Sequence, residues 1–174
     1  MNRGEDPSRW RHAQDPIGPH GDGVGGGGWG VSDAIEFWVD GLPKAQPRPR
    51  ACARNGHVSV YDPGTATEWK KCIEHAGRPH APVLPHDGPV GLRIWFAMPR
   101  PKSHYRAGGG LRDDAPTRHL AKPDLDNLEK AVMDTLTKIG FWRDDSLVCS
   151  KETHKVYGER PGCSIKVYGM VVTP

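Results

Sequence analysis

Acidic side chains flank the start of one predicted helix, and a second acidic pair follows its end. Asp124 and Asp126 are two residues apart, Lys130 lies four residues beyond Asp126, and Asp144 and Asp145 come after the helix. Carboxylates held close together in a partly dry site repel each other, so such clusters usually bind a hard cation. Oxygen ligands suit Mg²⁺ or Mn²⁺, which can polarise a phosphodiester and orient a water molecule. A nearby lysine could stabilise the charge of the transition state.

The same residues also fit a purely structural interpretation. Asp126 and Glu129 have the spacing of a capping box, in which two side chains hydrogen-bond to the first turn of a helix. An aspartate near a helix N-terminus also interacts favourably with the helix dipole, by roughly 0.3–1 kcal/mol. Asp144 and Asp145 could simply form a turn. Spacing alone therefore leaves a metal site and a structural role as alternatives.

The hydrophobic pattern predicts the elements that must position these side chains. A helix is expected from Asp124 or Asp126 to Lys138, and an earlier one from Thr65 or Thr67 to about Ala76. The buried stripe of the later helix comprises Leu125, Leu128, Val132, Leu136 and Ile139. Strands are expected over residues 34–39, 57–61, 90–98, 147–156 and 164–172. This order predicts a single small α+β domain over residues 33–174, with a mixed sheet packed by helices.

Residues 1–32 differ in composition from the rest of the chain. Seven of the ten residues from Gly21 to Gly30 are glycine, so the segment cannot bury enough apolar surface to offset its ordering entropy. We predict a disordered Gly-rich tail here. Within the 174 residues no apolar run has the length of a membrane span, and the N-terminus lacks the apolar core of a signal peptide. We therefore expect a cytoplasmic protein with no membrane partner and no organic cofactor.

Basic residues gather in two segments that could track the phosphates of a nucleic acid. The stretch from Gly41 to His57 contains no acidic residue, and a long polar loop spans residues 99–122. The net charge of +3 permits such a partner without requiring it, and solvated loops are the alternative. The predicted DNA-contacting side chains are Lys44, Arg48, Arg50, Arg54, Lys102 and Lys122.

The acidic motif resembles that of a known family. The run KPDLDNLEKAVMDTL at residues 122–136, followed by FWRDD at 141–145, is similar to the RusA family of phage and prophage Holliday-junction resolvases. Residues 99–105 and 47–50 also resemble segments of larger members, and the resemblance covers roughly residues 34–172. The Gly-rich tail and the longer loop at 99–122 depart from the family pattern.

The resemblance implies a fold, an activity and a set of site residues. It implies a small α+β homodimer that cleaves four-way DNA junctions by paired nicks with Mg²⁺, in DNA recombination and repair. The metal-binding aspartates of the family fall on Asp124, Asp126 and Asp145, and its essential lysine on Lys130, while Asp144 is an additional candidate ligand. A two-fold dimer supplies two identical sites for two opposed strands. The alternatives are a non-catalytic junction-binding or DNA-binding protein and a less selective nuclease for branched DNA or RNA.

Overall fold

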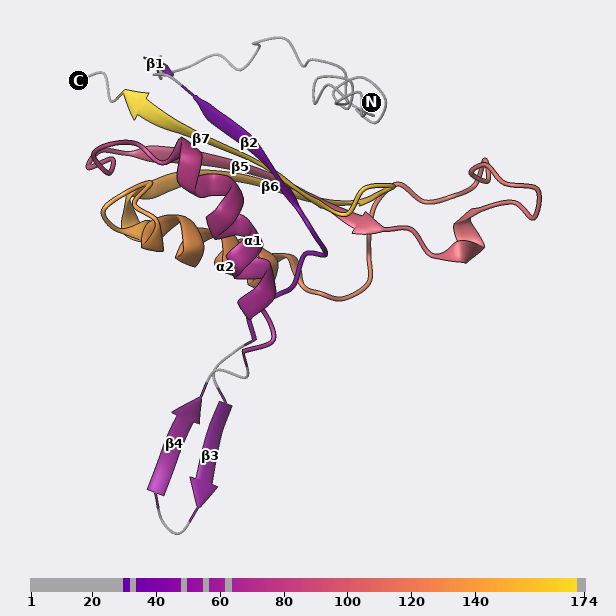
Figure 1. The fold of residues 1–174 in the computed structure, drawn as a ribbon, viewed down its shortest axis with the longest axis horizontal. Helices are drawn as coiled ribbons and strands as arrows, with labels where there is room; N and C mark the ends of the chain where they lie inside the picture. The colour runs from indigo at the N-terminus through magenta and orange to yellow at the C-terminus, as the bar shows by residue number, and fades with distance from the viewer. Residues whose placement is uncertain (1–29, 32–33, 48–49, 55–56, 62–63, 172–174) are drawn as a thin grey trace, which may run out of the picture.

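The computed structural model describes residues 30–31, 34–47, 50–54, 57–61 and 64–171, and it contains one mixed five-stranded sheet. The strands of this sheet are β1 (Gly30–Val31), β2 (Ile35–Asp40), β5 (Val90–Pro99), β6 (Val148–Gly158) and β7 (Gly162–Val171). β7 is antiparallel to β5 on one side and to β1 and β2 on the other, and β6 runs parallel to β5 at the far edge. The predicted single small α+β domain with a mixed sheet is confirmed (Figure 1).

Two helices, α1 (Thr67–Gly77) and α2 (Leu125–Lys138), lie side by side against one face of the sheet (Figure 1). The alternation along β5 explains this packing, because Ile94 is fully buried while the preceding Arg93 is exposed. From α2, Leu128 and Val132 enter the same core, and each buried side chain of this kind contributes about 1.5–3 kcal/mol. The predicted helices and the buried stripe of α2 are confirmed.

A two-stranded hairpin stands apart from the main sheet (Figure 1). β3 (Arg50–Arg54) pairs with β4 (His57–Tyr61), with Arg50 opposite Tyr61. The sequence predicted the second of these strands but not the first. The first has the composition Arg-Ala-Cys-Ala-Arg, which lacks the β-branched and aromatic residues that mark a strand.

The long polar loop forms an ordered arm, defined here as residues 100–121, which projects beyond the end of the sheet (Figure 1). Its return segment pairs with the outer edge of β6: the backbone N–H of Tyr157 donates to the carbonyl of Thr117 (2.8 Å), and that of His119 donates to Lys155 (3.2 Å). The rings of His104 and His119 each lie 4.7 Å from the ring of Tyr157, centroid to centroid. Edge pairing and ring packing therefore fix the base of the arm.

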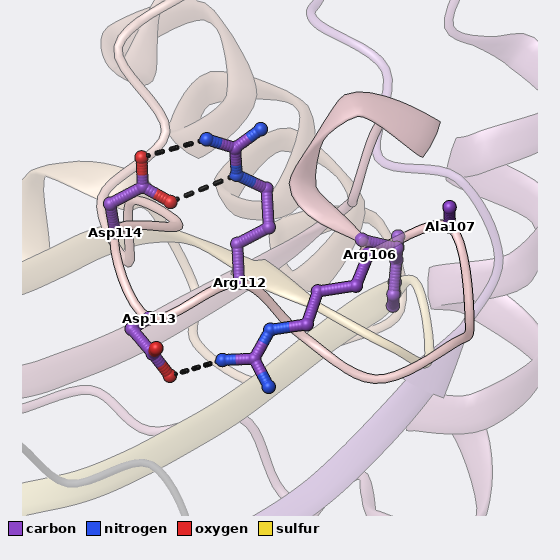
Figure 2. A pocket seen from close by; sticks show the side chains of 6 residues that line it. Arg106, Ala107, Arg112, Asp113 and Asp114 are labelled. Carbon is purple, nitrogen blue, oxygen red and sulfur yellow. Dashed lines mark hydrogen bonds and ion pairs between the residues drawn. The ribbon is translucent and has the colours of Figure 1, made fainter.

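The tip of the arm is closed by two ion pairs around a shallow hollow, which Figure 2 shows. Arg106 binds Asp113 at 2.5 Å, and Arg112 binds both carboxylate oxygens of Asp114 at 2.9 and 3.0 Å. These pairs neutralise the two arginines of the tip within the chain itself.

The predicted tail falls almost entirely outside the described residues. Only Gly30 and Val31 are described within residues 1–32, and they pair with β7 as the short strand β1. Among the described residues, three short 3₁₀ helices complete the elements: η2 (Arg78–His80), η3 (Lys102–His104) and η4 (Asp145–Leu147). In the described part of the chain, no helix combines the length and the apolar character that crossing a bilayer requires.

Candidate functional site

Asp124 and Asp126 both lie at the N-terminus of α2. Asp124 is the N-cap residue, with φ −70° and ψ 143°, and its side chain makes no capping hydrogen bond. Asp126 lies in the first turn, and both residues are exposed. Leu125, between them, packs against the core and so fixes the orientation of the turn. Two carboxylates are thus held where the helix dipole favours negative charge.

Lys155 anchors the segment that leads into α2. Its Nζ atom donates hydrogen bonds to the carbonyl oxygens of Ala121 and Pro123, each at 2.7 Å. On the other side, the backbone N–H of Gln46 donates to the carbonyl of Asn127 at 2.8 Å. The end of β6, the start of α2 and the extended segment after β2 therefore meet beside Asp124.

The capping-box alternative is wrong, because Glu129 does not turn back to the helix N-terminus. Lys151 Nζ donates a hydrogen bond to Oε1 of Glu129, and Thr153 Oγ1 donates to Oε2 at 2.8 Å. The Glu129 side chain is only 16% exposed, and its partly buried contacts connect α2 to β6. Asp124, rather than Asp126, occupies the cap position.

Lys130 faces α1, one turn beyond Asp126. Its Nζ atom donates to Oδ1 of Asp134 at 3.1 Å, and Lys70 of α1 approaches Oδ2 of the same carboxylate at 3.4 Å. The Lys130 side chain is 58% exposed. An exposed pair of this kind contributes about 0–1 kcal/mol, so its ammonium group can exchange this partner for another anion at little cost.

Asp144 and Asp145 precede β6 on a different part of the surface. Asp144 caps η4 by accepting a hydrogen bond from the backbone N–H of Ser146 at 2.9 Å, and this bond lowers the pKa of the Asp144 carboxyl below its ordinary value. Asp145 is the first residue of η4, and it is exposed.

A single chain does not bring the two acidic groups together. α2 has 14 residues and is about 21 Å long, and it runs back along the sheet from the end of β5 and β6 toward their beginnings (Figure 1). Asp124 and Asp126 therefore lie near one end of α2, while Asp145 lies near the other. Throughout the residues that the structure describes, no three His, Cys, Asp or Glu side chains are gathered as a metal site.

The donor set at the start of α2 nevertheless fits a hard cation. Mg²⁺ in proteins is commonly held by one or two carboxylates, with water and substrate phosphate as its further ligands. Asp124 and Asp126 provide two such carboxylates, exposed to solvent and two residues apart. A third carboxylate ligand would have to come from outside this end of the chain.

Five of the six predicted DNA-contacting residues are described, and they lie at three places. Lys44 and Lys122 both border a hollow beside Asp124. Lys102 begins η3 at the base of the arm and is exposed. Arg50 and Arg54 occupy the two ends of β3. Arg48 lies outside the described residues.

Three polar residues at this end escaped the sequence analysis: Gln46, Asn127 and Lys155. Asn127 lies within the recognised motif, and its place between Asp126 and the core residue Leu128 could have marked it. Gln46 and Lys155 carry no sequence signal, because their roles depend on contacts between segments far apart in the chain.

The chain is similar to known proteins over most of its length. The family model described as Endodeoxyribonuclease RusA matches residues 40–168. The chain is 32% identical over 137 residues to the uncharacterized protein YqaN of Bacillus subtilis (strain 168). The aligned region covers 78% of this chain and 96% of YqaN.

A shorter and closer similarity is found to the Crossover junction endodeoxyribonuclease RusA of Escherichia coli O139:H28 (strain E24377A / ETEC). It is 72% identical over 25 residues, which is 14% of this chain and 21% of that protein. The resemblance seen in the acidic motif is thereby confirmed over most of the chain. The protein belongs to the RusA family of endodeoxyribonucleases.

Proposed function

We propose that this protein is a Mg²⁺-dependent endonuclease that resolves four-way (Holliday) DNA junctions by paired symmetric nicks, in DNA recombination and repair. The observation that carries the proposal is the pair of exposed carboxylates, Asp124 and Asp126, at the N-terminus of α2 in a member of an endodeoxyribonuclease family. Mn²⁺ suits the same oxygen ligands and would replace Mg²⁺.

In this proposal Asp124 and Asp126 hold the ion, and basic residues hold the DNA around it. The bound ion supplies electrostatic stabilisation of the phosphodiester under attack and favours deprotonation of the attacking water. Lys130 exchanges its contact with Asp134 for an oxygen of the scissile phosphate, whose added negative charge it stabilises. Lys44 and Lys122, which line one hollow together with Asp124, neutralise neighbouring phosphates.

We also infer a homodimer in which each site takes residues from both copies. Asp145 lies near the opposite end of α2 from Asp124, so it cannot join the ligand set of its own chain. A two-fold partner whose α2 runs antiparallel to the first would bring its Asp145, with Asp144 as an additional candidate, to Asp124 of the first copy. Two such sites related by a two-fold axis match two nicks in opposed strands.

We propose that the arm and the hairpin of the protein contact the DNA duplexes that extend from the branch point. At the tip of the arm, Arg106 and Arg112 are already paired with acidic residues, which weakens any attraction for phosphate. Lys102, at the base of the arm, is therefore the stronger candidate for a backbone contact. In the hairpin, Arg50 and Arg54 are proposed to contact DNA, and Arg48 is proposed for the same role from the sequence.

The test incubates purified protein with a synthetic four-way junction, a flap, a linear duplex and an RNA duplex, each with and without Mg²⁺. We expect symmetric nicks in two opposed strands of the junction, which depend on the ion. Junction binding without cleavage in Mg²⁺ or Mn²⁺ would instead indicate a non-catalytic binding protein. Equal cleavage of the flap or the RNA would indicate a less selective nuclease.

A further inference from the structure

A mostly apolar hollow of about 460 Å³ lies directly beside Asp124. It is formed where the segment after β2 crosses the end of β5 and the start of α2. Its lining comprises Leu42, Pro43, Lys44, Ala45, Gln46, Pro47, Met98, Lys122, Pro123, Asp124 and Asn127. Ligand sites of this size and character are usually apolar cavities with a few placed polar groups.

Two amide side chains, those of Gln46 and Asn127, are the placed polar groups of this hollow. The backbone N–H of Gln46 donates to the carbonyl of Asn127 at 2.8 Å, which fixes the two residues relative to each other. Oε1 of Gln46 is buried and has no hydrogen-bond partner among the described residues. Because an unsatisfied buried acceptor is unfavourable, a rotation of the Gln46 side chain that brings Oε1 to a hydrogen-bond donor of a ligand in the hollow gains affinity.

The charges at the rim indicate what kind of ligand enters. Lys44, Lys122 and Asp124 are the charged residues of the lining, and Leu42, Met98 and Pro123 form its apolar wall. Such a wall suits the faces of a flat, weakly polar group, and two ammonium groups beside it suit anions attached to that group. A nucleotide, with its base inside and its phosphates at the lysines, has this combination.

We propose that this hollow binds one unstacked base of the DNA, beside the phosphate that is cut. The inference rests on the proposed function, because it assigns a specificity subsite to the same active site. Extruding a base costs least where pairing or stacking is already weakened, as it is at a branch point. The protein would thus recognise the junction partly by the base that the branch point releases.

The unpaired acceptor of Gln46 also gives the subsite a base preference. Amino groups of adenine and cytosine donate hydrogen bonds to an amide oxygen. Thymine has a carbonyl oxygen at the corresponding position and only its ring N3–H as a donor, so a base held with its exocyclic group at Oε1 would leave the acceptor unpaired when it is thymine. We expect cleavage to be roughly tenfold faster when adenine or cytosine, rather than thymine, occupies the nucleotide beside the cut.

The first experiment detects the extruded base directly. A four-way junction carries a single 2-aminopurine at successive positions around the branch point, and the Asp126→Asn variant binds it in Mg²⁺ without cutting it. We expect fluorescence to rise at one position next to the cleavage site. The variant Leu42→Trp should abolish the rise by filling the hollow, while Leu84→Trp should retain it.

Leu84→Trp is the control for Leu42→Trp, because both leucines are exposed and Leu84, between α1 and β5, does not line the hollow. The second experiment compares cleavage of junctions that carry each of the four bases beside the cut. The variant Gln46→Met keeps the length of the side chain and removes its amide. It should abolish the base preference, so that junctions with adenine, cytosine or thymine beside the cut are cleaved at about the same rate. Circular dichroism and thermal unfolding establish that each variant is folded.

The outcomes separate this inference from the proposed function. If the protein cuts junctions but fluorescence stays flat at every position, no base is extruded and the subsite is refuted. If folded Gln46→Met keeps the wild-type base preference, the assignment of Gln46 is refuted. If the wild-type protein neither binds nor cuts junctions, the proposed function itself fails and the subsite fails with it.

Discussion

Lys155 donates a hydrogen bond at 2.7 Å to the carbonyl oxygen of Pro123, the residue that immediately precedes Asp124. Through this bond and a second one to Ala121, the edge strand β6 determines where α2 begins. We predict that Lys155→Met slows single-turnover cleavage by roughly tenfold or more, because a displacement of about 1 Å at a catalytic group has effects of this order. Lys166→Met, on β7 and also half-buried, is the matched control. If Lys155→Met and Lys166→Met slow cleavage equally, the proposal that Lys155 positions the start of α2 is refuted.

Asp126→Asn should abolish Mg²⁺-dependent cleavage while junction binding is preserved or becomes tighter. The substitution removes one proposed ligand of the ion and also one negative charge near the DNA. Cleavage assays and gel-shift titrations measure the two effects separately. Asp87→Asn, at an exposed position away from the motif, should leave both unchanged. Full Mg²⁺-dependent nicking by Asp126→Asn would refute the ligand assignment.

Lys130→Ala should lower the rate of cleavage much more than the affinity for the junction. The reason is that the ammonium group is proposed to act on charge that develops in the transition state. Lys70→Ala is the control, because Lys70 contacts the same Asp134 carboxylate from α1. If the affinity of Lys130→Ala collapses while bound DNA is cut at the normal rate, Lys130 serves binding alone.

Mixing two inactive variants tests whether the site is shared between copies. Asp126→Asn and Asp145→Asn should each be inactive alone. In a mixed dimer, one site would combine Asp126 of one copy with Asp145 of the other, so it would contain both native residues. If the copies exchange freely, we expect about one quarter of the wild-type nicking, with a cut in one strand only. Continued inactivity of the mixture, with mixed dimers shown to form, would contradict the shared site.

The base of the arm should loosen in mild acid. Burial, reinforced by the charge of Lys155, lowers the pKa of His119 below its ordinary value of 6.5. The unfolded imidazole therefore binds a proton more readily than the folded one, and stability is fully present above pH 6.5 and decreases as pH falls through the lower folded value. Hydrogen-exchange protection of the Tyr157 amide, corrected for intrinsic rates, should fall over this range. In His119→Phe this pH dependence should disappear; its persistence would point to another group.

Local patterns predicted the framework of the fold well. The stripe that contains Leu128, Val132 and Leu136 predicted both α2 and the face that it buries, because helical spacing alone determines which side chains share a face. The strand at β3 was missed, since nothing in its composition signals pairing. The sequence also did not predict that the arm has a defined conformation. This conformation depends on hydrogen bonds to β6, whose residues are far from the arm in the chain.

The residues of the candidate site stay a prediction from the sequence, and their arrangement within one chain differs from what the sequence indicated. The sequence indicated that Asp124, Asp126 and Asp145 would converge, yet α2 separates the first two from the third within one chain. A rigid helix keeps its ends apart whatever the chemistry of the residues there. The contributions of Gln46 and Lys155 depend on tertiary contacts, which spacing along the chain does not encode.

The tip of the arm is closed on itself: the N–H of Arg106 donates to the carbonyl of Gly110, and that of Arg112 donates to His104. The base is held separately, by the pairing between Thr117 and Tyr157. Insertions or deletions between these closures would change how far the arm reaches without disturbing the start of α2. The arm is thus a place where natural variation can alter the reach of the enzyme along its substrate at little cost to the folding of the catalytic domain.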